Sequence, residues 1–137
     1  MNSLEEGAAL QLDFGKIAKT AARCPEVLPV AVQDADSGEV LLVGYTNETA
    51  FRRACAERRL ILWSTSRNEL WEKGKTSGET FELLEVRVNC EQNSLLYKVR
   101  PRRGGMCHTR NRAGRPRAGC YYRRLAWDTL SLEHLDP

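Results

Sequence analysis

Long apolar runs, internal repeats and low-complexity segments are all absent from the sequence. No stretch approaches the roughly 20 consecutive apolar residues that a membrane-spanning helix needs, and the first residues lack the basic-then-apolar order of a signal peptide. The 137 residues are 42% hydrophobic and 28% charged, which is typical of a globular domain. We therefore expect one domain over residues 1–137, located in the cytoplasm and without a membrane partner.

Closely spaced cysteine pairs are absent as well, although the chain has five cysteines. Thiols stay reduced in the cytoplasm, so metal binding or burial is favoured over disulfide bonds. Three thiolates with an open fourth position are typical of catalytic zinc, but the wide spacing of the cysteines leaves their simple burial open. Three of the thiols and one of only two histidines lie in one third of the chain, namely Cys90, Cys107, Cys120 and His108.

A strong net charge is the third absence, because 21 basic and 18 acidic residues leave only +3 at pH 7. The excess is local, since residues 100–124 hold nine arginines and no acidic residue. Such a segment suits a phosphate-bearing partner, although the loop from Arg110 to Arg117 could also be an ordinary solvated loop. His108 could be a fourth metal ligand, a proton carrier or an exposed loop residue, whereas His134 is expected at the surface.

Helices are predicted mainly near the start of the chain. One or two short helices are expected in the segment 1–24, where Ser3 as N-cap and Glu6 would form a capping box. A further helix is expected after Asn47, which would cap it. At the other end, residues 126–137 are expected to form a tail that packs through Trp127 and Leu130.

Most of the remaining chain has the periodicity and turn residues of β-hairpins, which predicts an α+β fold with a mostly antiparallel, barrel-like sheet and a few helices. Leu84, Val86 and Val88 are expected to share one face of their strand, and Cys90 lies in the turn that follows it. The predicted strands are 27–33, 39–45, 60–66, 82–88, 94–99 and 121–125.

Hydroxyl and cationic side chains are frequent between Trp63 and Gly78, where they could cradle a phosphate group. Composition by itself favours an ordinary polar strand edge over that interpretation, and it favours core positions for Trp63 and Trp71. The candidate phosphate ligands are Ser64, Ser66, Arg67, Lys73, Thr76 and Ser77.

Taken together, several segments resemble phosphoribosyl-AMP cyclohydrolase, a family of histidine-biosynthesis enzymes. The resemblance runs in order from about Leu28 to Arg123 and is most specific in the run Trp63–Gly78. Val86–Cys90 and Cys107–Thr109 also match the family pattern. The family resemblance implies that most of the chain is a single cyclohydrolase-type domain that forms a homodimer.

The resemblance also implies a reaction, in which a zinc-bound hydroxide opens the six-membered purine ring of 1-(5-phosphoribosyl)-AMP. Cys90 of one chain would meet Cys107 and Cys120 of the other at the dimer interface, and His108 would carry the proton. The substrate, a phosphorylated small molecule, would be bound by Trp63, Ser64, Ser66, Arg67, Lys73, Thr76 and Ser77. No nucleic-acid partner is expected on this interpretation.

Two departures from the family pattern concern the metal and the loop between the last two cysteines. The family surrounds its first cysteine with three aspartates that hold magnesium, whereas this chain has Asn89, Glu91 and Asn93 there. Three negative charges become one, so magnesium is expected to bind weakly or not at all. The loop 110–119 is longer and rich in arginine, whose charge could replace that of magnesium.

These departures leave two alternatives to the leading interpretation. One is a zinc hydrolase paralogue that acts on a different nucleotide or heterocycle in secondary metabolism. The other is an inactive paralogue that binds nucleotide or RNA through its arginine-rich loop.

Overall fold

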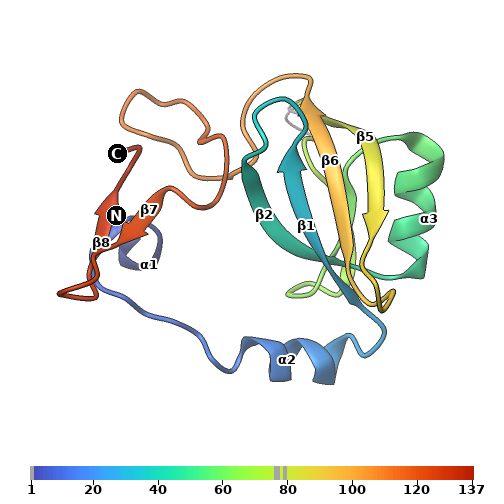
Figure 1. Cartoon of the computed structure of the whole chain (residues 1–137), viewed down its shortest axis with the longest axis horizontal. Coiled ribbons are helices and arrows are strands. Elements are labelled where there is room, and N and C mark those ends of the chain that lie inside the picture. Colours follow the sequence, from blue (N-terminus) through green and yellow to red (C-terminus); the bar gives the residue numbers. More distant parts are fainter. Residues whose placement is uncertain (1, 76–77, 79) are drawn as a thin grey trace.

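The computed structural model describes residues 2–75, 78 and 80–137. Its main sheet has four strands in the order β2–β1–β6–β5 (Figure 1). Antiparallel pairs join β1 (Leu28–Asp34) to β2 (Val40–Thr46) and β5 (Phe81–Val88) to β6 (Leu95–Pro101), while β1 and β6 run parallel. Both predicted hairpins are confirmed, as is the α+β class with mostly antiparallel strands.

A β-bulge in β5 corrects the predicted face of that strand. The register shifts between Leu83 and Glu85, so the strict alternation expected for Leu84, Val86 and Val88 is broken. Leu83 is buried, whereas Val88 is 54% exposed. The extra residue therefore moves the core-facing position by one residue along the strand.

A short hairpin of β3 (Ile61–Ser64) and β4 (Glu69–Glu72) extends the sheet toward a barrel. The segment just before β3 bonds to the outer edge of β5, because Leu60 N donates to Phe81 O at 3.1 Å and Leu83 N donates to Arg58 O at 3.0 Å. Lys73 N in turn donates to Leu60 O at 3.2 Å. These bonds cover an edge that would otherwise expose unpaired backbone groups.

Helix α3 (Glu48–Glu57) packs against β3 and begins where the sequence predicts. The Asn47 side chain accepts a hydrogen bond from Ala50 N at 3.0 Å, which caps the helix. Ala50 and Ala54 are fully buried. The core between the sheet, the β3–β4 hairpin and α3 is apolar, and its largest fully buried side chains are Tyr97, Phe81, Leu60, Ile61, Val30, Val32 and Val99.

The two ends of the chain meet in a terminal module, defined here as residues 2–8 and 122–137 (Figure 1). It contains α1 (Ser3–Glu6), β7 (Arg123–Leu125) and β8 (Leu132–His134), while α2 (Lys16–Arg23) lies apart from it. Arg123 donates to the carbonyls of Gly7 and Leu4, both at 2.9 Å, and Leu132 N donates to Ala8 O at 2.8 Å. Long-range polar contacts therefore join the N-terminus to the last hairpin.

Two expectations about the chain ends are wrong. Asn2, and not Ser3, is the N-cap of α1, because its side chain reaches the backbone N–H of Leu4 and Glu5 from outside the helix. The tail does not pack through Trp127, which is 87% exposed, or through Leu130, which is 55% exposed. Among the described residues, no helix combines the length and apolarity that crossing a membrane requires.

Candidate metal and substrate site

The segment 104–120, called here the thiol loop, folds back on itself as an irregular hairpin. Cys107 N donates to Arg117 O and Arg117 N to Thr109 O, both at 3.1 Å, and Arg110 forms a bridge with Pro116. After this hairpin, Cys120 N donates to Leu41 O at 2.7 Å, which fixes the end of the loop to β2. The arginine-rich insertion is thus an ordered hairpin tip, and its fold returns the chain to Cys107.

This fold brings two of the three predicted zinc ligands together. Cys107 and Cys120 lie near enough for each thiol to affect the ionisation of the other, and Cys107 Sγ lies 3.0 Å from Thr109 Oγ1. Cys120 is exposed as a residue, but enough protein surrounds its thiol for burial to raise the pKa of that thiol to about 12. The Cys107 thiol adds to the rise, while Lys73 opposes it.

The third predicted ligand, Cys90, lies elsewhere in the same chain. It is exposed and follows β5, in the turn that leads to β6. Within the described part of the chain, no three His, Cys, Asp or Glu side chains are grouped so that they could hold one metal ion. One chain therefore presents two thiols in one place and the third thiol in another.

The residues at the predicted magnesium positions bind one another. Asn89 Oδ1 accepts hydrogen bonds from Asn93 N and Ser94 N, both at 2.9 Å, and Asn89 Nδ2 donates to Asn93 Oδ1 at 2.7 Å. Asn93 Nδ2 donates to Glu91 Oε2 at 3.2 Å. Most of their side-chain oxygens accept hydrogen bonds within the turn, and Glu91 is the only one of the three side chains that carries a negative charge. This set does not fit a magnesium ion, which requires several oxygen ligands in near-ideal octahedral geometry.

His108 follows Cys107 and points to the terminal module. Its side chain is 79% exposed, and its Nε2 lies 2.5 Å from Glu5 Oε2 of α1. Sequence reasoning did not find Glu5, because it lies 103 positions from His108 and no local pattern links them. The prediction that His134 lies at the surface is wrong, because its side chain is only 20% exposed and its Nε2 lies 3.1 Å from Glu6 Oε1.

A groove of about 300 Å³ lies on β2 and the β3–β4 hairpin and gathers most of the predicted substrate ligands. It is lined by Trp63, Ser64, Ser66 and Arg67, as the family resemblance implies. The groove also has wall residues that the sequence did not assign to the substrate, namely Lys16, Tyr45 and Trp71, for the last of which a core position was expected. Aromatic rings, hydroxyls and cations therefore share one surface, which suits a phosphorylated aromatic ligand.

The groove and the thiol pair lie along the same strand. Leu41 holds Cys120, while Leu42, Val43 and Gly44 line the groove. Successive residues of a strand advance by roughly 3.3 Å, so the two features are neighbours on β2. Lys73, which is buried, lies on the thiol side and not in the groove. The remaining predicted ligands, Thr76 and Ser77, lie outside the described residues.

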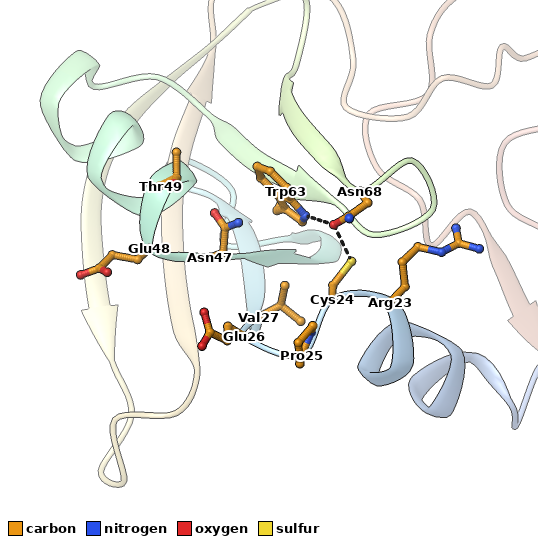
Figure 2. A pocket seen from close by; sticks show the side chains of 10 residues that line it. All are labelled: Arg23, Cys24, Pro25, Glu26, Val27, Asn47, Glu48, Thr49, Trp63 and Asn68. Carbon is orange, nitrogen blue, oxygen red and sulfur yellow. Dashed lines mark hydrogen bonds between the residues drawn. The ribbon is translucent and has the colours of Figure 1, made fainter.

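A second cleft, of about 360 Å³, lies beside Trp63 where β1 and α3 begin (Figure 2). Figure 2 shows the Asn68 side chain between Trp63 and Cys24. Asn68 Oδ1 accepts from Trp63 Nε1 and from the Cys24 thiol, both at 3.1 Å. This bonding fixes the β3–β4 turn and the indole ring, so Cys24 is a buried structural thiol with no place at the thiol pair.

Comparison with known proteins agrees with this arrangement. A family model described as phosphoribosyl-AMP cyclohydrolase matches residues 42–122. The chain is 42% identical over 106 residues to the phosphoribosyl-AMP cyclohydrolase of Hyphomonas neptunium, covering 77% of this chain and 76% of that protein. It is 39% identical over 128 residues to the phosphoribosyl-AMP cyclohydrolase of Halobacterium salinarum, covering 93% of each.

These matches place the chain in a class of hydrolases, the cyclohydrolases, that open a ring. Within that class, it belongs to the phosphoribosyl-AMP cyclohydrolase family. The matched region contains the thiol loop and every groove residue except Lys16, whereas α1, α2 and β8 lie outside residues 42–122.

Proposed function

We propose that this protein hydrolyses the purine ring of 1-(5-phosphoribosyl)-AMP, a reaction of histidine biosynthesis. The observation that carries the proposal is the position of the Cys107–Cys120 pair, which lies next to His108 and is anchored to Leu41, the residue of β2 just before the groove lining begins. The names of the relatives support the same substrate. The reaction needs an activated water and a site that holds a charged nucleotide, and these features would provide both.

The donor set of the thiol pair fits zinc. Cys107 and Cys120 offer two neighbouring soft thiol ligands, which are of the kind that zinc prefers. Cys90 would complete the ligand set from a second copy of the chain, because it is exposed on a separate turn. A zinc ion held by these cysteines supplies a water of lowered pKa.

The remaining side chains divide the other tasks. His108 is exposed on the thiol loop, so its ring can exchange a proton with substrate or solvent, and Glu5 holds that ring from α1. Trp63, Trp71 and Tyr45 offer rings for the base. Phosphate binding is assigned to Lys16, Ser64, Ser66 and Arg67, with Thr76 and Ser77 kept from the family resemblance.

The fold of the arginine loop makes one of its four arginines unavailable to RNA, while Arg110, Arg112 and Arg115 are exposed. Arg117 is only 2% exposed and forms an ion pair with Glu6, so it is not offered to a phosphate. The loop tip lies against the C-terminus, where Arg112 N donates to Pro137 O at 3.1 Å. Arg117 therefore stabilises the fold of the loop. It does not replace the charge of a magnesium ion at the substrate.

The direct test is to incubate the purified protein with phosphoribosyl-AMP and to follow the absorbance of the ring-opened product. We expect turnover that a metal chelator abolishes and that added zinc restores. Absence of turnover in the zinc-loaded protein would remove the proposed substrate. Turnover that resists complete removal of zinc would remove the proposed metal.

A further inference from the structure

An ion pair joins the thiol loop to the N-terminus, between Arg117 and Glu6. Arg117 donates from Nη1 to Glu6 Oε2 at 2.7 Å, from Nη2 to Glu6 Oε1 at 2.9 Å and from Nε to Asp136 O at 2.9 Å. Its guanidinium also lies 4.2 Å from the centre of the Tyr122 ring. All three nitrogens of a buried cation are thus used, in the two-point geometry that makes Arg–carboxylate pairs strong.

The backbone of Arg117 is in direct contact with the metal-site segment. Its carbonyl accepts from Cys107 N and its N–H donates to Thr109 O, both at 3.1 Å. The backbones of Gly105 and Arg117 are closely packed, since a Cβ atom added to Gly105 would lie 2.3 Å from Arg117 O. Any movement of Arg117 would therefore displace Cys107 relative to Cys120, which is anchored separately to Leu41.

We infer that Glu6 and Arg117 are positioning residues for the thiol pair, and that their ion pair sets the separation of Cys107 and Cys120. The inference rests on the proposed metal site. Glu6 lies outside residues 42–122, the region matched by the family model. Its contact with Arg117 is therefore an addition to the part of the site that the family model covers. Loss of Glu6 leaves a buried guanidinium without its counter-ion, which favours rearrangement of the segment that carries it.

The first test compares Glu6→Gln with Glu133→Gln in the full-length protein. Glu133 is a matched control, because it pairs at 3.1 Å with Arg124 in the same module but on the exposed surface. We expect Glu6→Gln to weaken zinc binding by up to roughly 10-fold, the low end of the loss that follows removal of a direct partner of a metal ligand, because Glu6 acts through Arg117. Glu133→Gln should match the wild type, and Glu6→Asp should recover part of the loss. Affinity is measured by competition with a chromophoric zinc chelator.

A purely structural role gives a different result. In that case Glu6→Gln would lower the unfolding temperature of the metal-free protein but leave the zinc affinity of the folded protein unchanged. That outcome would overturn the inference.

A second measurement separates this inference from the proposed metal site, because it needs no metal. Diamide oxidises neighbouring thiols to a disulfide, so the rate of Cys107–Cys120 linkage in the metal-free protein reports their separation. We expect Glu6→Gln to slow the linkage several-fold while Glu133→Gln does not, with the product identified by peptide mass analysis. Equal rates in all three proteins would overturn the inference, whether or not the wild type binds zinc.

Discussion

The three cysteines of the candidate metal site occupy two unlike settings. Cys107 and Cys120 lie in a loop held by backbone hydrogen bonds, by a buried ion pair and by attachment to β2. Cys90 lies exposed in a turn that is shaped by its own neighbours, Asn89 and Asn93. One chain thus fixes two thiols together and leaves the third exposed in a separate turn, which is the arrangement that the proposed two-chain site requires.

The first prediction tests the fixed setting and carries the largest effect. Cys107→Ser should lower zinc affinity by more than the roughly 10- to 100-fold that loss of an outer-shell partner costs, because it removes a direct ligand. Cys24→Ser is the matched control, since Cys24 is also buried and also hydrogen-bonded. Metal analysis should find zinc without magnesium in the wild type and in Cys24→Ser. Zinc content that is unchanged in Cys107→Ser would show that the thiol pair is not the metal site.

The second prediction tests the division between the two settings. Co-expressed Cys90→Ser and Cys107→Ser chains should regain about a quarter of wild-type activity, because half of randomly assembled dimers are mixed and each mixed dimer keeps one of two symmetric sites intact. Each variant alone should be inactive. Co-expressed Cys107→Ser and Cys120→Ser chains are the control, since every site they form lacks one thiol of the pair. No recovery in the first mixture would place all three ligands in one chain.

How far the fold could be predicted depends on how local its causes are. The hairpins and α3 were predictable, because Asn47 caps its own helix and turn residues such as Asp34 and Gly38 act within a few positions. The bulge in β5 was not, since an extra residue inside a strand leaves the apolar composition unchanged.

The candidate site divides in the same way. Its thiols, His108 and four of the groove residues could be named from the sequence, because the family pattern consists of short motifs; these four are Trp63, Ser64, Ser66 and Arg67. The contacts of Glu5 with His108 and of Glu6 with Arg117 could not, because they join residues 103 and 111 positions apart. Only the packing of the terminal module brings these residues together, and no periodicity encodes it.

The third prediction has the smallest expected effect and concerns acid. Hydrogen bonds from Arg117 lower the pKa of Glu6 from its usual value near 4.5 to about 2, and His134 adds to the lowering. Folded-state Glu6 thus holds its proton less tightly than unfolded-state Glu6, so its stabilising contribution is complete above pH 4.5 and is lost as the pH falls toward 2. The urea midpoints of wild type and Glu6→Gln should therefore converge as the pH falls from 4.5 toward 2, whereas Glu133→Gln should follow the wild type throughout. A constant gap between wild type and Glu6→Gln would mean that ionisation of Glu6 does not stabilise the thiol loop. The settings of Cys107 and Cys90 would then differ through backbone bonding alone.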